Sequence, residues 1–143
     1  MIKSVNLLKP KMNKDFDKWN KIKKEVDSKI ENDRLFFADG DVWWVHLGLN
    51  VGFESNGKDE EFMRPVIVLK KHNKYSFLAL PLTTASKTNK YRISVGIIDG
   101  KNAFANLSQI RNLDSKRLIN KIGHLDMKIM RKIKEKTRRV NLD

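Results

Sequence analysis

The sequence contains no cysteine among its 143 residues, and this absence removes two kinds of structure. No disulfide can form, and no metal site can be built from thiolates. The absence fits a reducing compartment, so we expect a cytoplasmic location. No apolar run approaches the roughly 20 residues that a helix needs to cross a bilayer. The basic N-terminus, MIKSVNLLKPKMNKDF, lacks a long apolar stretch and a small-residue cleavage site, so we expect no signal peptide.

Several motifs that carry chemistry are also missing. The sequence has no phosphate-binding loop of the P-loop type, no dinucleotide fingerprint and no internal repeat. Its three histidines, His46, His72 and His124, are scattered and do not have the spacing of metal ligands. We interpret them as structural or surface residues, and we expect no metal and no other cofactor.

What the sequence does have is positive charge. Lys and Arg total 30 against 17 for Asp and Glu, which gives a formal net charge of +13. Such a field attracts nucleic acid, an anionic membrane or an acidic protein. Most of the excess is lysine, which is equally typical of a solvated surface, so charge alone does not choose among these partners.

The length predicts one domain with an extension, and we place the boundary so that residues 1–39 form a helical extension and residues 40–143 the main domain. Residues 1–14 show no periodicity. From Asp15 to about Glu31, apolar residues recur every three or four positions, which predicts a helix with Asp15 as its N-cap. These apolar residues are Phe16, Trp19, Ile22, Val26 and Ile30.

The main domain is rich in short β-type segments. The predicted strands are DVWWVHLGL, RPVIVLKK, YSFLALPL, YRISVGII and AFANLSQIRNL, the last with a bend near Ser108. Pro81 cannot donate to a ladder and predicts an edge or a strand end. DSKRLINK predicts a helical turn capped by Asp114, IGHL a last short strand, and Asp126 the cap of a helix to about Arg139. This order predicts a mainly β (α+β) fold, a small bent antiparallel barrel with helices on its surface.

One corner of this barrel collects polar residues. Arg64 opens one strand of a predicted hairpin, and Thr83 closes the other. Because antiparallel neighbours run in opposite directions, the two residues should lie at the same end of the hairpin. The long loop Asn50–Met63, which carries Glu54, should cover that end. An arginine, a hydroxyl and a carboxylate suit a phosphate ester, although an ordinary strand edge explains the same residues.

At these residues the sequence resembles the MazF/PemK family of toxins, from roughly Gly40 to Val140. The resemblance rests on motifs in a fixed order: GDVWWVHLG, VGFES, RPVIVL, LPLTT, and LSQIRNLDSKRL followed by KIGHLD. It implies a barrel of the CcdB/MazF type with a C-terminal helix, forming a homodimer. It also implies metal-independent cleavage of single-stranded RNA, in which the 2′-hydroxyl attacks the adjacent phosphate and leaves a cyclic phosphate and a 5′-hydroxyl.

The resemblance also implies roles for individual residues. Arg64 and Thr83 match the essential arginine and threonine, Glu54 matches the loop glutamate, and Gln109 matches a glutamine that contacts RNA. We expect Arg64 to stabilise transition-state charge and Thr83 to position the phosphate. A threonine hydroxyl is a poor base, so Glu54 is the candidate general base. Residues expected to contact RNA are Thr84, Ser86, Lys87 and Gln109, with Lys90 as a further candidate.

The chain departs from the family in three places. The loop between Glu54 and Arg64 is longer and more acidic, Ser108 replaces an aspartate found in some members, and the helix at 15–31 is not part of the common core. That helix has three possible uses: packing on the barrel, covering the dimer surface, or replacing an antitoxin contact. An acidic antitoxin is the expected partner for a surface of charge +13.

Two other functions fit the same sequence. One is a non-enzymatic toxin on the same barrel, resembling CcdB, which binds DNA gyrase. The other is an RNA-binding module with an inactive corner, which would bind RNA in a salt-dependent way without cleaving it.

Overall fold

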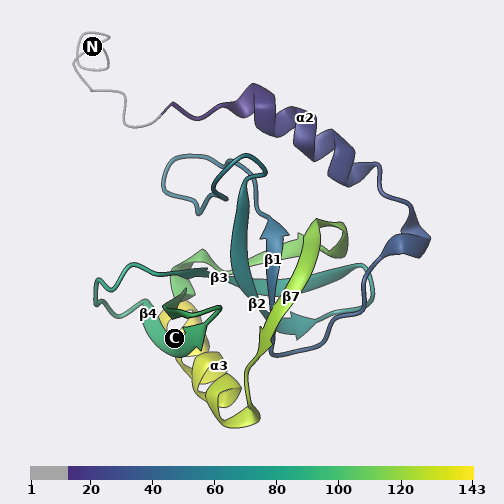
Figure 1. Cartoon of the computed structure of the whole chain (residues 1–143). Helices are drawn as coiled ribbons and strands as arrows, with labels where there is room; N and C mark the ends of the chain where they lie inside the picture. Colours follow the sequence, from purple (N-terminus) through teal and green to yellow (C-terminus); the bar gives the residue numbers. More distant parts are fainter. Residues whose placement is uncertain (1–12) are drawn as a thin grey trace, which may run out of the picture.

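A computed structural model describes residues 13–143 (Figure 1). Its strands are β1 (Asp41–His46), β2 (Met63–Lys71), β3 (Ser76–Thr83), β4 (Arg92–Ile98), β5 (Lys101–Asn106), β6 (Arg111–Asp114) and β7 (Leu118–His124). Its helices are α2 (Phe16–Asp27) and α3 (Met127–Leu142), with 3-10 turns η1 (Glu31–Asp33), η2 (Leu107–Gln109) and η3 (Ser115–Arg117). The sequence shows no periodicity over residues 1–14, and residues 1–12 of that segment lie outside the described part. In the described part, no helix is long and apolar enough to cross a membrane.

The strands form one strongly curled antiparallel sheet, as the sequence predicts. Its order is β4-β5-β3-β2-β1-β7, and β6 pairs with the other end of β3. Bulges interrupt the pairing of β1 with β7, of β2 with β3 and of β4 with β5. A bulge adds local bend and twist to its strand, which curls the sheet.

Both faces of the central strands are buried. In β2, Ile67 and Leu69 belong to a cluster that includes α3, whereas Val66 and Val68 belong to a second cluster on the other face. Successive side chains of a strand point to opposite faces, so one apolar run supplies both clusters. This explains why RPVIVLKK reads as a continuous hydrophobic segment rather than an alternating one.

The C-terminal helix α3 lies on the surface of the curled sheet, as predicted. The carboxylate of Asp126 accepts the backbone N–H of Ile129 at 2.8 Å, which caps the helix. Met130 and Ile133 are buried against the first cluster, and the remaining surface of the helix is mostly exposed and basic.

Two details of the predicted strands are wrong. The segment 103–113 is not one bent strand, because η2 separates β5 from β6 and each pairs with a different part of β3. Pro81 lies neither at an edge nor at a strand end, since it pairs with Val66 inside β3. It stands between the stretch of β3 that pairs with β6 and the stretch that pairs with β5. Its missing N–H therefore falls where β3 changes neighbours.

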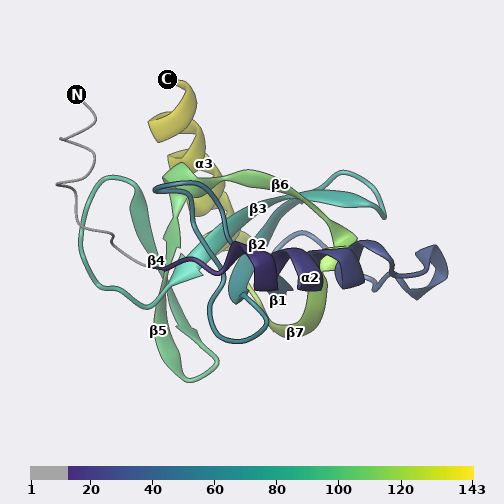
Figure 2. The ribbon, with the colours of Figure 1, turned by 90° about the horizontal axis from the view of Figure 1, so that it is seen from above.

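The N-terminal helix α2 packs across the barrel at the end opposite α3 (Figures 1 and 2). The carboxylate of Asp15 accepts the N–H of Lys18 and caps the helix, as predicted. The helix ends at Asp27, four residues earlier than the predicted Glu31, and the backbone is extended at Ile30. Packing on the barrel, the first of the three uses considered for this helix, is what the structure shows.

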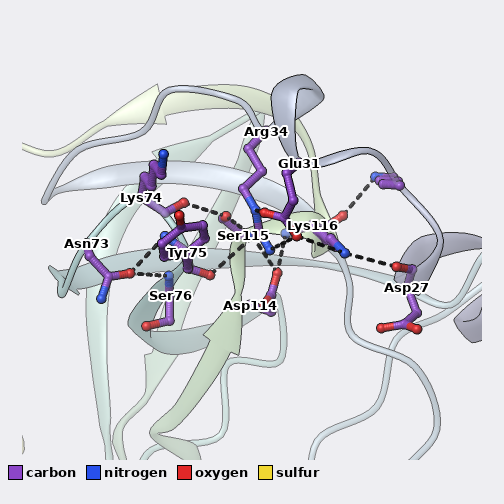
Figure 3. Close-up of polar contacts among 11 residues, drawn as sticks. Asp27, Glu31, Arg34, Asn73, Lys74, Tyr75, Ser76, Asp114, Ser115 and Lys116 are labelled. Carbon is purple, nitrogen blue, oxygen red and sulfur yellow. Dashed lines mark hydrogen bonds and ion pairs between the residues drawn. The ribbon is translucent and has the colours of Figure 1, made fainter.

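The segment that joins α2 to β1 is anchored by Arg34 (Figure 3). Its guanidinium donates to Asp114 and to the hydroxyl of Ser115, each at 2.7 Å, and pairs with Glu31. The hydroxyl of Ser115 is buried and donates to the Lys74 carbonyl at 2.7 Å. The extension is therefore fixed to η3 and to the β2–β3 turn.

Candidate active site

Arg64 and Thr83 meet at one corner of the sheet, as the sequence predicts. The register of β2 with β3 pairs Val66 with Pro81, which brings the two residues to the same end of the hairpin. Both line a pocket of about 240 Å³, here called the Arg64 pocket. Its lining residues are Trp44, Lys58, Asp59, Met63, Arg64, Pro65, Leu82, Thr83, Thr84, Ile98, Asp99, Lys101, Ala103 and Ile122.

The guanidinium of Arg64 is half-buried and held by backbone carbonyls. Its Nε donates to Asn56 at 2.5 Å and its Nη1 donates to Leu82 at 3.0 Å. Burial lowers the pKa of Arg64 from its ordinary value, although an arginine stays protonated in proteins. Among residues 13–143, no carboxylate forms an ion pair with it and Nη2 has no protein partner. The site therefore holds a cation that is free to bind an anion.

Thr83 is the last residue of β3, and its hydroxyl has a defined position. The Thr83 oxygen accepts the N–H of Ala85 at 3.1 Å, which fixes the start of the 84–91 loop. This bond uses the oxygen as acceptor, so the O–H remains available to donate. Thr84, the next residue, also lines the Arg64 pocket and is exposed.

Glu54 lies apart from the Arg64 pocket. Its carboxylate accepts the N–H of Val51 at 2.9 Å within the β1–β2 loop, defined here as residues 47–62. It lines a second hollow, whose residues are Asn50, Glu54, Ser55, Ser108, Gln109, Ile110, Arg111 and Asn112. The structure thus brings Arg64 and Thr83 together, and it places Glu54 with Gln109 instead.

Gln109 holds the β1–β2 loop against η2. Its Oε1 accepts the N–H of Ser55 at 2.8 Å, and its Nε2 donates to the Phe53 carbonyl at 3.0 Å. The ring of Phe53, the residue before Glu54, is fully exposed. The side-chain amide of Gln109 is therefore engaged with the protein, whereas the ring of Phe53 is open to solvent.

The other predicted RNA contacts lie in the 84–91 loop. Ser86, Lys87 and Lys90 are all exposed. The guanidinium of Arg92 organises this loop, since it donates to the carbonyls of Ala85 at 3.1 Å and Lys87 at 3.2 Å. These lysines extend from a braced loop rather than from a regular element.

Sequence reasoning missed part of the pocket wall. Lys58 and Asp59 come from the β1–β2 loop, Asp99 comes from the turn between β4 and β5, and Lys101 is the first residue of β5. Nothing in the sequence placed the segment 99–101 beside Arg64. Two lysines and two carboxylates therefore join the predicted corner.

The histidines have structural surroundings. Nδ1 of His46 lies 3.0 Å from the Glu61 carbonyl, and Nδ1 of His124 lies 2.8 Å from the Asp41 carboxylate. His72 is exposed in the β2–β3 turn. Within the described residues, no group of three or more potential ligands is arranged to hold a metal.

A curled antiparallel sheet with a C-terminal helix, presenting an arginine and a threonine in one pocket, defines a small class of proteins. Residues 38–140 match the profile of the PemK-like, MazF-like toxin of type II toxin–antitoxin systems. The chain belongs to this family. It is 32% identical over 105 residues to "Endoribonuclease EndoA" of Bacillus subtilis, covering 67% of this chain and 86% of that protein.

Solved structures show the same fold. MazF (Form-I) from Deinococcus radiodurans has a TM-score of 0.61 at 17% identity, covering 74% of this chain and 96% of that one. A mycobacterial endoribonuclease in complex with its cognate antitoxin has a TM-score of 0.57 at 19% identity, covering 76% and 98%. The family match begins at residue 38, so α2 lies outside it.

Proposed function

We propose that this toxin is an endoribonuclease that cleaves single-stranded RNA through the RNA's own 2′-hydroxyl. The observation that carries the proposal is Arg64: a half-buried cation without an anionic partner in the described residues, beside the hydroxyl of Thr83. The relative EndoA is named as an endoribonuclease, and it aligns with two thirds of this chain. We place the protein in the cytoplasm, where RNA is available.

In this reaction the 2′-oxygen forms a bond to phosphorus, and the bond from phosphorus to the 5′-oxygen breaks. The 2′-hydroxyl loses its proton, the departing 5′-oxygen gains one, and the products are a 2′,3′-cyclic phosphate and a 5′-hydroxyl. Because the nucleophile belongs to the substrate, no bound metal is needed to generate it. Negative charge grows on the phosphate oxygens during attack.

Arg64 and Thr83 suit this charge. The free Nη2 of Arg64 donates to a phosphate oxygen, while its backbone bonds keep the guanidinium from turning away. The O–H of Thr83 donates to a second oxygen and orients the phosphate. Donors fixed before the reaction need no rearrangement in the transition state.

For the group that accepts the proton of the 2′-hydroxyl, we propose residues other than the one expected from the sequence. Glu54 is the base expected from the sequence, yet its carboxylate bonds within its own loop and lines the second hollow. We therefore assign Glu54 to RNA binding. The carboxylates that line the Arg64 pocket, Asp59 and Asp99, are the candidates for proton transfer.

The RNA strand is proposed to run from the Arg64 pocket over both loops. Lys87 and Lys90 bind backbone phosphates, with Thr84 and Ser86 beside them. On the other side, the exposed ring of Phe53 stacks on a base next to Glu54 and Gln109. Unpaired bases are needed for such stacking, which favours single-stranded RNA.

We also propose a homodimer that binds an acidic antitoxin. The D. radiodurans MazE-MazF structure has a TM-score of 0.54 to this chain, and a mycobacterial relative was solved with its cognate antitoxin. A surface of net charge +13 attracts an acidic segment in the same way as RNA. Size measurement by light scattering and copurification with the product of a neighbouring gene test the two partners.

The test of the reaction is incubation of the purified protein with a long RNA in EDTA. We expect cleavage to products with cyclic-phosphate and 5′-hydroxyl ends. Arg64→Ala and Thr83→Ala should each lower kcat/KM by about 100-fold or more while the protein stays folded. Arg138→Ala, at an exposed arginine on α3, is the matched control.

Two results would overturn the assignment. Wild-type rates in both pocket variants would remove Arg64 and Thr83 from the reaction. Salt-dependent RNA binding without products would indicate an RNA-binding module with an inactive corner.

A further inference from the structure

The two ends of the β1–β2 loop meet at Gly48 and Phe62, close to Arg64, and we call these two residues the neck of the loop. The backbone of the neck is strained. Phe62, two residues before Arg64, is a buried non-glycine residue with φ of 53°. This left-handed conformation is unfavourable for a bulky side chain and persists only where the surroundings enforce it. The neck is closed by the N–H of Gly48, which donates to the Phe62 carbonyl at 3.0 Å. The residues packed around Phe62 must therefore stabilise this left-handed conformation.

Trp19 of α2 packs on both sides of that neck. Its ring meets the Phe62 ring edge to face, with centroids 5.7 Å apart and planes at 64°. A Cβ atom at Gly48 would overlap the indole, so the ring lies directly on the Gly48 backbone. Only 7% of Trp19 is exposed. The N-terminal extension thus supplies the packing surface for a strained residue of the barrel.

Arg117 also packs against the indole ring of Trp19. Its guanidinium lies 5.9 Å from the Trp19 ring, within the range of a cation–π interaction. It also donates to the carbonyls of His46 at 2.9 Å and Leu47 at 3.2 Å, at the end of β1. Trp19 is therefore fixed from both ends of the loop and from η3.

The neck is connected to Arg64 by a short series of hydrogen bonds. The N–H of Gly57 donates to the Gly48 carbonyl at 2.7 Å. The residue before it, Asn56, offers the carbonyl that accepts Nε of Arg64 at 2.5 Å. A shift of Gly48 or Phe62 therefore moves the group that orients the guanidinium.

We propose that Trp19 is a positioning residue for Arg64, so that this toxin depends on an N-terminal helix outside the matched family region. The proposal rests on the proposed function, because it assigns Arg64 to RNA cleavage. Two lysines of the extension reinforce the contact: Lys14 donates to the carbonyls of Asn50 at 2.7 Å and Gly52 at 3.3 Å, and Lys18 pairs with Glu60. These contacts, exposed or only partly buried, contribute little individually, and the buried indole carries the coupling.

The experiment compares Trp19→Ala with Val26→Ala in the full chain. Val26 is the other buried apolar residue of α2, so its variant loosens the helix without removing a contact to the loop neck. We expect Trp19→Ala to lower kcat for a short RNA by about 10- to 100-fold with little change in KM, because small misplacements of a catalytic group have effects of this size. Trp19→Phe should restore most of the rate, and Val26→Ala should keep it.

Amide hydrogen exchange supplies a readout that does not depend on activity. Trp19→Ala should speed exchange at Gly57 and at Met63, the first residue of β2, by about tenfold or more, while β3 and the rest of β2 keep their protection. In Val26→Ala the faster exchange should be confined to α2. If Trp19→Ala does not fold, Trp19→Leu takes its place, because leucine fills the site without the aromatic edge.

Each contrary result has a separate meaning. Wild-type exchange in the β1–β2 loop of the folded Trp19 variant, or an equal loss of rate in the Val26 variant, would overturn the positioning role. Absence of RNA cleavage by the wild-type protein would overturn the proposed function instead. In that case, fast exchange at Gly57 would still show that Trp19 orders the loop.

Discussion

Asp41 is a buried carboxylate at the start of β1, and its neighbours keep it ionised. Burial alone would raise its pKa, but hydrogen bonds from His124, the Ala38 N–H and the Trp43 indole, together with Lys121, hold the pKa below its usual value. Its two oxygens thereby join the end of the extension to β1 and β7.

This carboxylate predicts a pH-dependent contribution to stability. Its folded pKa is depressed, so the contribution is complete above the ordinary value of about 4 and is lost as the pH falls through the lower folded value. Asp41→Asn should lower the free energy of unfolding by about 2 kcal/mol at pH 7. The deficit should shrink at a second, acidic pH below the lowered folded pKa, where the wild-type carboxyl is neutral like the asparagine side chain.

Urea unfolding at both pH values measures the effect, and Asp33→Asn, at an exposed aspartate, is the control. A deficit of the same size at both pH values would show that Asp41 acts through packing rather than through its charge.

At the level of elements, the β1–β2 loop is held by η2 on one side and by α2 on the other. Gln109 makes the first attachment, through one bond accepted from Ser55 and one donated to Phe53. The net contribution of one hydrogen bond to stability is about 1 kcal/mol. Each bond therefore restrains the loop weakly, and the two together restrain it more firmly.

Gln109→Ala should therefore loosen the tip of this loop and leave the Arg64 pocket intact. We expect amide exchange at Ser55 to rise by up to about tenfold, and KM for RNA to rise more than kcat falls. Gln109→Glu keeps the acceptor for Ser55 but not the donor to Phe53, so an intermediate value is expected. A fall in kcat with KM unchanged would place Gln109 in the chemistry rather than in the loop.

The elements also show what the sequence could predict. Arg64 and Thr83 were predictable as neighbours, because they end adjacent antiparallel strands and the turn between them is short. The position of Glu54 was not, because the loop path depends on side-chain bonds such as the one from the Asn50 N–H to Asn56. Asp99 and Lys101 reach the pocket only through the curl of the whole sheet, which no local pattern encodes.

For the whole molecule, Arg34 is a polar anchor between the extension and the barrel. The pairing with Glu31 raises the pKa of Arg34, and the same pairing lowers the pKa of Glu31 to about 2. Arg34 also reaches Asp114, Ser115 and the Tyr75 carbonyl, on segments far along the chain (Figure 3). We therefore expect residues 13–39 and the barrel to unfold together.

Arg34→Ala should break this cooperativity. In the wild type, the helical circular dichroism of α2 and α3 and the tryptophan fluorescence should give one thermal transition. In the variant, the part of the helical signal that comes from α2 should be lost at a lower temperature than the part from α3 and the fluorescence of Trp43 and Trp44 in β1. Lys24→Ala, at an exposed basic residue of α2, should leave the transitions coincident. Coincident transitions in the Arg34 variant would mean that the other contacts of the extension, such as the packing of Trp19, are enough to join the two parts.

The packing of Trp19 also has a consequence for the order of events during translation. The helix that carries Trp19 leaves the ribosome before Gly48, Phe62 and Arg117, which surround its ring. The surroundings of the Trp19 ring are therefore complete only after translation has passed η3, which supplies Arg117. A nascent chain or an early-terminated fragment that stops before η3 has all the residues of the hairpin corner but lacks Arg117, one of the contacts that fix the Trp19 ring.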